Sequence, residues 1–229
     1  MLKACTLFIL FFLTIFSEKS NAQADSLRSP FSSTTFGVQA GLGLMHFSGR
    51  NANGEKFGGE NLLRFRGGAN MDIPLSAFIS IRPELLFSMG GYKTKDSLKT
   101  DLSYLKIPSS IVFKLLNLPR ENSIADVLSI GIGSYFAYAI DGRLKDNSSS
   151  SMVKFANRDV SSTTLGYADY FKRWDTGINA FLEFTGTNFF SQIGSSIGLT
   201  NIKPRLDNPG AHQAICKNAS INLSYGWRF

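Results

Sequence analysis

Two histidines and one late cysteine are the residues of this chain best suited to catalysis or metal binding. The histidines are His46 and His212, and His46 has Ser48 close by. A serine nucleophile needs a histidine base that a third group, usually a carboxylate, orients. Neither histidine stands in a spacing that indicates such a triad. Cys216 follows His212 by four positions, but no second pair of ligands completes a metal site. The sequence therefore predicts a protein that is not an enzyme and that has no catalytic or metal site.

The glycine-rich run GVQAGLG at 37–43 could be mistaken for a dinucleotide-binding fingerprint. It lies inside a strand-like stretch and no helix follows it, so the context that such a site needs is missing. The basic residues are also divided among many segments instead of being interleaved with aromatic residues on one surface, which argues against nucleic-acid binding. We expect no cofactor and no nucleic-acid partner.

Eight stretches that alternate between apolar and polar residues would have to position every group of interest. They are 34–47, 62–73, 77–93, 102–116, 126–141, 174–186, 188–200 and 221–229. Many are 12–17 residues long, whereas strands of soluble proteins are usually about 5–6 residues. A tilted strand needs about 9–11 residues to cross a bilayer. This pattern predicts an all-β fold, an eight-stranded antiparallel up-and-down transmembrane β-barrel.

The connections between these stretches mostly alternate between long and short. PLSA at 74–77 and TGTN at 185–188 are short, and 142–173 is very long. The link at 117–125 is longer than the turn we expect there. Outer-membrane barrels have short periplasmic turns at one rim and long extracellular loops at the other. An even strand number also places both ends of the barrel on the short-turn side.

The polar positions of the strands carry charges of both signs. An eight-stranded barrel has an interior that side chains can fill, and charges buried there must pair. We therefore predict a charge network that plugs the lumen, with Glu84 near Arg64 or Arg66 across the 74–77 turn. Its predicted members are Arg64, Arg66, Arg82, Glu84, Lys106, Lys114, Glu183 and Arg228. Alternation alone also fits a soluble lipocalin-like carrier, in which the apolar side faces inward.

The N-terminus has the pattern of a cleaved signal peptide. Lys3 precedes an apolar run at 5–16, and small residues follow as far as Ala24. The run of 12 residues is shorter than the roughly 20 that a spanning helix needs. We predict a signal peptide at 1–24 with cleavage after Ala22 or Ala24, a short segment at 25–33 and a barrel domain at 34–229.

Over residues 34–229 the chain resembles the PorT-like outer-membrane β-barrel family of Bacteroidetes. The resemblance rests on YLKIP at 104–108, GVQAGLGL at 37–44 and FRGGANMDIPL at 65–75. The last stretch resembles the outer-membrane assembly signal, with Ser224 where glycine is usual; its predicted residues are Asn222, Tyr225, Trp227 and Phe229. The resemblance implies a barrel in the cell outer membrane and, from the name-giving member of the family, a link to protein secretion.

We expect a monomeric, non-enzymatic outer-membrane barrel that acts structurally or through its extracellular loops. The expected partners are outer-membrane lipid and lipopolysaccharide, the barrel assembly machinery and secretion-system proteins. The basic residues expected to face phosphorylated lipid A are Arg50, Lys56, Lys93, Lys95, Lys99, Lys145, Arg158, Lys172, Arg173, Lys203 and Arg205. The alternatives are a soluble lipocalin-like periplasmic carrier of a small apolar ligand and a lipid-modifying outer-membrane enzyme.

Overall fold

The computed structural model describes residues 33–50, 54, 59–94, 99–117, 127–145, 150–156, 170–205 and 213–229. The predicted signal peptide lies outside the described residues, so it stays a prediction. The barrel falls within the compact unit Phe31–Phe229. In the described parts of the chain, no helix has the length and apolar character needed to cross a membrane.

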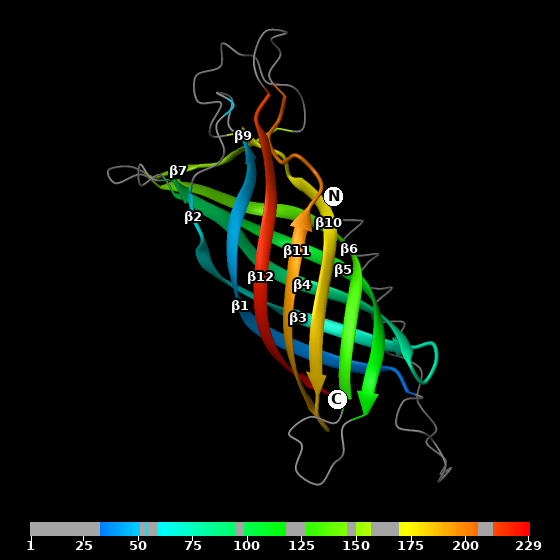
Figure 1. Ribbon diagram of the computed structural model, residues 1–229. Coiled ribbons are helices and arrows are strands. Elements are labelled where there is room, and N and C mark those ends of the chain that lie inside the picture. The colour runs from blue at the N-terminus through cyan, green and yellow to red at the C-terminus, as the bar shows by residue number, and fades with distance from the viewer. Residues whose placement is uncertain are drawn as a thin grey trace, which may run out of the picture. The chain divides into compact units, whose positions relative to one another are not determined.

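Eight long strands form the wall of a closed antiparallel barrel. They are β1 (Thr35–Arg50), β3 (Leu62–Pro74), β4 (Ile79–Thr94), β5 (Lys99–Asn117), β6 (Val127–Lys145), β10 (Trp174–Thr185), β11 (Phe189–Gly198) and β12 (Ile215–Arg228). Each pairs with the next in chain order, and β12 returns to pair with β1, from Gly37 opposite Arg228 to Arg50 opposite Ile215. Figure 1 shows β1 (blue) and β12 (red) side by side. The ring leaves no open edge among these eight strands, as a membrane-spanning sheet requires.

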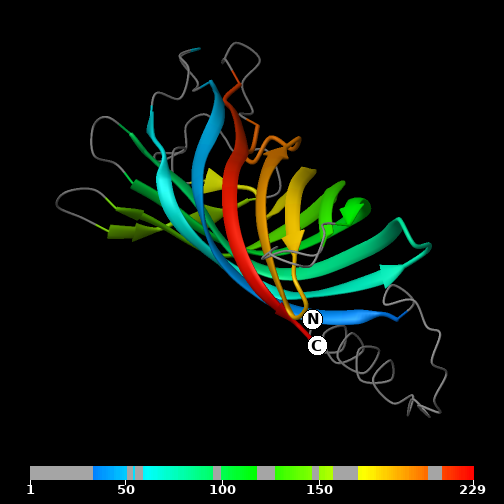
Figure 2. The same ribbon diagram turned by 60° about the horizontal axis from the view of Figure 1, so that its bottom comes forward.

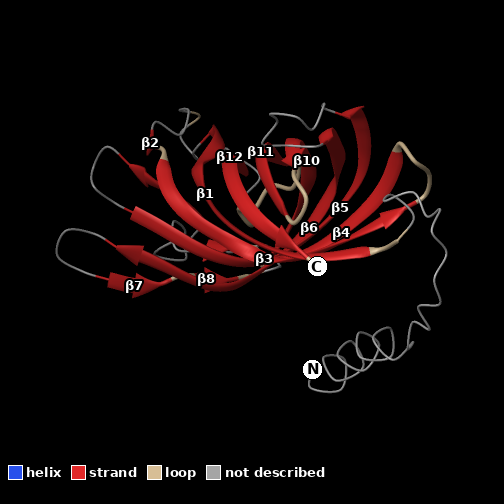
Figure 3. Cartoon of the chain, turned by 90° about the horizontal axis from the view of Figure 1, so that it is seen from below, coloured by secondary structure: helices blue, strands red, loops and turns tan. Residues whose placement is uncertain are grey.

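Four short strands lie outside this ring of eight. They are β2 (Gly59–Glu60), β7 (Ser150–Met152), β8 (Lys154–Phe155) and β9 (Tyr170–Phe171). β2 pairs with β4, β7 extends the sheet from β6, and β8 pairs with β9 in parallel. Figures 2 and 3 show β2 and β7 at the end of the barrel away from the C-terminus. β2 and β7 therefore belong to the long-loop end.

Tight turns define the opposite, short-turn end. Between β3 and β4, the amide of Leu75 donates to the carbonyl of Ile79 at 2.9 Å, and the amide of Ile79 donates to Oγ of Ser76 at 3.1 Å. Between β10 and β11, the amide of Gly186 donates to the carbonyl of Phe189 at 2.8 Å. By the outer-membrane rule this end is periplasmic and the long-loop end is extracellular. The link at 117–125 lies almost wholly outside the described residues.

The wall has its apolar side chains outside and its polar side chains inside. On β12, Ile221, Leu223 and Tyr225 are 57–61% exposed. The alternate residues Asn222 and Ser224 point inward and are at most 4% exposed. A soluble half-buried sheet shows the reverse arrangement, so lipid must cover this outer face. The alternative of a soluble lipocalin-like carrier is therefore wrong, because its cavity would have to be apolar.

Glycines in the wall make room for aromatic rings that fill the lumen. A Cβ on Gly131 of β6 would overlap the ring of Phe181, and one on Gly226 of β12 would overlap the ring of Phe190. Both rings are buried, with exposed fractions of 6% and 0%. Because a glycine faces each ring, the ring can lie close against the opposing backbone.

The predicted strand limits lie within four residues of the observed ones, except at the start of the last strand. β12 begins at Ile215, six residues before the predicted start at 221. Its first residues alternate poorly, because Lys217 and Ala219 occupy the outward positions. They still form the ladder with β1 up to Arg50. The apolar pattern marks only the part of the strand that lipid covers, and the paired strand continues beyond it.

Candidate functional site in the barrel lumen

The lower lumen, near the short-turn end, holds an ion network around Arg82 of β4. This arginine is only 1% exposed. Its Nη2 donates to Oε1 of Glu183 on β10 at 3.0 Å, and its Nε lies 3.3 Å from Oδ1 of Asp72 on β3. Arg228 of β12 donates from Nη2 to the same Glu183 oxygen at 2.6 Å. Two arginines thus face two carboxylates, which is the balance that buried charges require.

Aromatic rings complete this lower layer, which we call the lower ion network. The guanidinium carbon of Arg82 lies 5.4 Å from the ring centroid of Phe181. That of Arg228 lies 4.8 Å from the centroid of Phe190. A cation over a ring face is stabilised by the ring quadrupole, by about 0.5–2 kcal/mol. The rings and ion pairs together fill the section of the lumen between β4, β10 and β12.

The middle of the lumen contains a second pair. Nη2 of Arg66 on β3 lies 3.8 Å from Oε2 of Glu84 on β4, and Gln39 of β1 donates to that same oxygen at 2.7 Å. The prediction left open whether Arg64 or Arg66 approaches Glu84, and the structure selects Arg66. Arg64 instead forms its ion pair with Asp101 of β5.

Lys106 of β5 has an aromatic neighbour. Its Nζ lies 3.6 Å from the ring centroid of Tyr135 on β6. The hydroxyl of Tyr135 donates to Oδ2 of Asp175 on β10 at 3.0 Å, and Nδ2 of Asn218 on β12 donates to the same oxygen at 2.8 Å. The side chain of Tyr135 therefore lies between the ammonium of Lys106 and the carboxylate of Asp175 and contacts both.

The structure thus divides the predicted lumen set into separate layers. Arg82, Glu183 and Arg228 meet in the lower ion network, and Arg66 meets Glu84 above them. Lys114 lies on β5 and is half-buried. The partners that lie outside the predicted set are the acidic Asp72, Asp101 and Asp175 and the uncharged Gln39, Tyr135 and Asn218. The last three are uncharged, so a search for opposite charges could not find them; inward position on a strand was the available signal.

Small cavities lie between the described residues of this lumen. One of about 30 Å³ is lined by Tyr104, Lys106 and Asp175, among others. A second of about 20 Å³ is lined by Arg66 and Asn222, among others. A cavity needs roughly 10–15 Å³ to hold a water molecule, so each suits single waters rather than a substrate. Oδ1 of Asp175 and Nε of Arg66 have no protein hydrogen-bond partner among the described residues, and water is the group that fits them.

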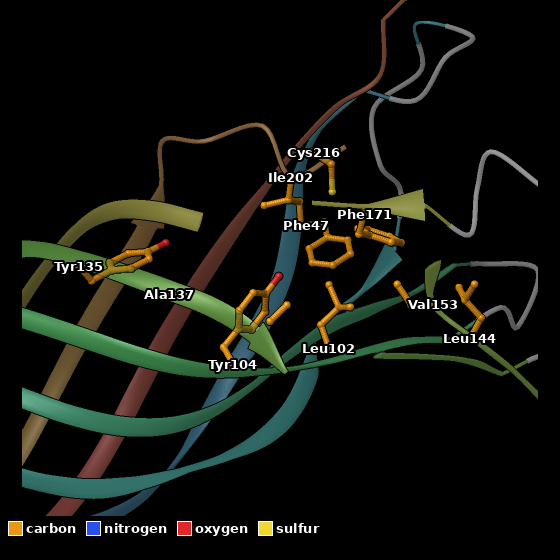
Figure 4. Close-up of a cluster of buried hydrophobic side chains, with 11 residues drawn as sticks. Phe47, Leu102, Tyr104, Tyr135, Ala137, Leu144, Val153, Phe171, Ile202 and Cys216 are labelled. Carbon is orange, nitrogen blue, oxygen red and sulfur yellow. The ribbon is translucent and has the colours of Figure 1, made fainter. Parts of the chain in front are cut away.

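An apolar cluster closes the lumen at the long-loop end; we call it the cap. Figure 4 shows its side chains converging from strand ends and from the segments between strands. Phe47 of β1 packs against Phe171 of β9 with ring centroids 6.0 Å apart. The buried members are Phe47, Leu102, Tyr104, Tyr135, Ala137, Ala139, Leu144, Val153, Phe171, Ile202 and Cys216.

Backbone hydrogen bonds fasten the cap to the barrel. The amide of Ile202 donates to the carbonyl of Cys216 at 2.8 Å, and the amide of Lys172 donates to the carbonyl of Ile202 at 2.7 Å. Oδ1 of Asn201 accepts from the amide of Cys216 at 2.8 Å. Lys203 places its Nζ 3.7 Å from the ring centroid of Phe171. The segment after β11 therefore ties β9 to the start of β12.

Of the residues weighed for chemistry, those that the structure describes lie apart from one another. His46 and Ser48 lie on the outward, exposed face of β1, and His212 lies outside the described residues. Cys216 is buried in the cap and free of any disulfide. Within the described ranges, no three His, Cys, Asp or Glu side chains lie close enough together to hold a metal ion.

The four residues predicted as the assembly signal lie near the short-turn end of β12. Asn222 points into the lumen and is buried. Tyr225, Trp227 and Phe229 are exposed by 57%, 45% and 76%, and the ring of Tyr225 stacks with that of Phe189 on β11, with centroids 6.0 Å apart. Three outward aromatic residues here match the interfacial girdle of an outer-membrane barrel.

Comparison with known proteins gives one family. The model of the outer membrane protein beta-barrel domain matches residues 21–203. No curated protein sequence matches the chain significantly.

Several solved barrels are similar in structure but distant in sequence. Ail of Yersinia pestis, solved with the heparin analogue sucrose octasulfate, is 12% identical with a TM-score of 0.46, covering 86% of this chain and 99% of Ail. Neisserial surface protein A is 10% identical with a TM-score of 0.47, covering 86% of this chain and 99% of that protein. OprG from Pseudomonas aeruginosa is 10% identical with a TM-score of 0.39, covering 86% and 97%.

Proposed function

Because the chain belongs to the outer membrane protein beta-barrel domain family, we propose that it is a non-conducting barrel that presents a folded cap to a partner outside the cell. Its location in the outer membrane follows from the family and agrees with the lipid-facing wall. The proposal concerns what the barrel does there, and it includes no catalytic step.

The observation that carries this proposal is the closure of one lumen at two levels. Arg82 and Glu183 close the lower section, and the apolar cap closes the upper one. Two cavities lined by described residues between them measure about 30 and 20 Å³. A channel needs a continuous wet path, which porins of 16–18 strands leave open. Neither a pore nor a carrier cavity for a drug-sized ligand, which needs about 300–1,000 Å³, fits these dimensions.

Planar-bilayer recording tests the closed lumen directly. Purified, folded barrel should give no stepwise conductance in potassium chloride. A double variant, Arg82→Ala with Phe171→Ala, should be the form that conducts, because it removes a member of each closure. Stable unitary currents through the unchanged protein would contradict the proposal.

The partner is best sought at the cap. We propose that it is a protein of a secretion system, an assignment supported only by the PorT-like resemblance of the strands. Native membranes can be solubilised and the barrel captured, with the cap intact or altered at Phe171. Recovery of the same secretion-system components with intact cap only would support the assignment; recovery of none from membranes that contain such a system would refute it.

We further propose that the barrel assembly machinery recognises the outward aromatic residues at the end of the chain. The proposal is supported by the exposed side chains of Tyr225, Trp227 and Phe229. Phe229→Ala should lower the assembled, heat-modifiable fraction in cells while leaving spontaneous folding into thin vesicles unchanged. An equal loss in both settings would point to stability instead of recognition.

A further inference from the structure

An aromatic and basic cluster lies on the outer surface of β6 and β10 at the long-loop end. The ring of Trp174 contacts those of Tyr138, with centroids 4.4 Å apart, and Phe136, with centroids 4.8 Å apart. Trp174 is 44% exposed and Phe136 40% exposed on the outer wall. The three rings form a continuous patch across the two paired strands, since Trp174 lies opposite Tyr138 in the ladder.

The position of this patch on the barrel fixes its level in the membrane. Trp174 and Phe184 both point outward on β10 and are ten residues apart. At about 3.3 Å per residue this is roughly 33 Å along the strand, or about 25 Å along the barrel axis at a tilt of about 40°. That equals the height of the apolar band of such barrels. With Phe184 at the inner interface, Trp174 lies at the outer one, at the level of lipid headgroups.

Arg173 lies directly next to this patch and is held in place. Its guanidinium carbon is 4.4 Å from the ring centroid of Phe155 and 5.6 Å from that of Tyr138. Its Nη1 donates to the carbonyl of Ala139 at 3.2 Å. A guanidinium stacked on rings loses little further freedom when it binds an anion, and its planar fork matches phosphate oxygens.

Two described lysines add positive charge near Arg173. Lys172 precedes it, and Lys154 of β8 extends over Tyr170 with Nζ 5.5 Å from the ring centroid. The carboxylate of Asp141 on β6 is engaged by Arg143 at 3.6 Å. Outer-leaflet lipids with phosphate groups carry the opposite charge at this level.

We propose that Arg173, seated against Phe155 and Tyr138 above Trp174, binds the phosphate of an anionic lipid in the outer leaflet. Lys172 and Lys154 raise the local positive potential, and the rings of Trp174 and Phe136 contact the adjoining acyl and glycosyl region. We call these residues the rim site. It adjoins the cap, since Phe155 packs against the buried cluster, but its proposed ligand is a lipid and not the protein partner that the cap is proposed to bind.

Lipid retention tests the rim site in the whole, folded barrel. The protein is folded in detergent, titrated with diphosphoryl lipid A, and bound lipid is counted by native mass spectrometry. Arg173→Glu should weaken binding about tenfold or more, since a hydrogen bond to a charged group contributes about 1.5–3 kcal/mol. Arg173→Lys should keep part of the affinity, because it keeps the charge but loses the fork.

The matched control reverses charge on a different wall of the barrel. Lys217 lies on the outward side of β12, which pairs with β1 and β11 rather than with β6 or β10. Lys217→Glu should leave lipid A binding within about twofold of the unchanged protein, because a single charge at the surface contributes little. Equal losses for Lys217→Glu and Arg173→Glu would overturn the rim site in favour of unspecific attraction.

A second measurement does not depend on an altered arginine. The chain has two tryptophans, so Trp227→Phe leaves Trp174 as the only reporter. Its emission should change on addition of diphosphoryl lipid A, and not on addition of lipid A lacking phosphates or of inorganic phosphate alone. An equal response to the dephosphorylated lipid would overturn the role of phosphate. A response to inorganic phosphate alone would overturn the selection of lipid and leave a general anion site.

Discussion

The lower ion network and the cap close the same lumen by opposite means. The lower ion network joins Arg82, Arg228, Asp72 and Glu183 through hydrogen-bonded ion pairs. The cap joins apolar side chains such as Phe47, Phe171 and Ile202 through burial. Both regions are nearly free of solvent, yet charged groups make the contacts in the first and apolar groups make them in the second.

The two regions differ in how much free energy a single substitution removes. Removal of one partner from a buried ion pair is very destabilising, because it leaves the other charge uncompensated. An apolar cluster loses free energy in proportion to the surface and cavity exposed. The cap lies at the strand ends near water, where apolar burial is a driving force. We therefore expect a sharp response to mutation in the lower ion network and a graded, local response in the cap.

Glu183→Ala should have the largest effect of any single change in the lumen. It leaves Arg82 and Arg228 facing each other without their shared carboxylate, and the expected loss is about 3–5 kcal/mol of unfolding free energy. Urea titration of the barrel in lipid vesicles, followed by the heat-dependent gel shift, measures it. Glu183→Gln should lose less, because the amide oxygen still accepts a hydrogen bond. Equal stability of Glu183→Ala and the unchanged protein would show that this network does not hold the barrel.

Phe171→Ala should destabilise the cap by an amount comparable to the loss expected for Glu183→Ala, but the effect should be confined to the cap. Truncation of a buried phenylalanine to alanine typically lowers the free energy of unfolding by about 3–5 kcal/mol. Here we expect the cap to open while the wall stays folded. Cys216 reports this opening, because it is fully buried beside Phe171. Maleimide labelling of Cys216 in intact membranes should accelerate at least tenfold, while the urea midpoint of the barrel changes little. Ser48→Cys, exposed on β1, calibrates the rate of an open thiol. A large loss of barrel stability without faster labelling would make the cap part of the wall's cooperative unit.

Glu84→Gln should have an intermediate effect. Glu84 faces Arg66 at 3.8 Å and accepts from Gln39 at 2.7 Å. The substitution keeps the shape and removes the charge, so the loss should be about 1–3 kcal/mol, the range for a buried polar group left without its partner. The same urea titration measures it. Gln39→Glu combined with Glu84→Gln moves the charge by two strands, from β4 to β1, and should recover part of the loss. A result as large as that of Glu183→Ala would mean that the two layers act as one network.

The sequence predicted the wall better than the contents of the lumen. Alternation at residues such as Ile221, Leu223 and Tyr225 predicted both the strand and its outward face, because lipid favours apolar side chains at the outward positions of the spanning part. Arg64 shows what alternation does not predict. We expected either Arg64 or Arg66 to pair with Glu84, but the partner of Arg64 is Asp101, two strands away. Strand register fixes such pairings, and alternation with period two excludes a slip of one residue but not a slip of two.

The cap was beyond prediction for a related reason. Phe171 and Ile202 come from segments between the wall strands, where no period marks a side chain as buried. They become core residues only because β9 and the segment after β11 fold over the barrel end, held by hydrogen bonds from Lys172 to Ile202 and from Ile202 to Cys216. Loop residues of this kind are identified by contacts between distant segments, which one sequence does not reveal.

Glu60→Gln should have the smallest effect and thereby sharpen the contrast between buried and exposed charges. Glu60 of β2 pairs with Lys93 of β4 at 3.2 Å, with side chains 72% and 41% exposed. This is an ion pair between a carboxylate and a cation, like that of Glu183 and Arg82, but water already solvates both groups. Removal of its charge should cost about 0–1 kcal/mol, measured by the urea titration in vesicles and reduced further in high salt. If Glu60→Gln destabilised the barrel as much as Glu183→Ala, burial would not be what makes the lower ion network sensitive to the loss of one charge.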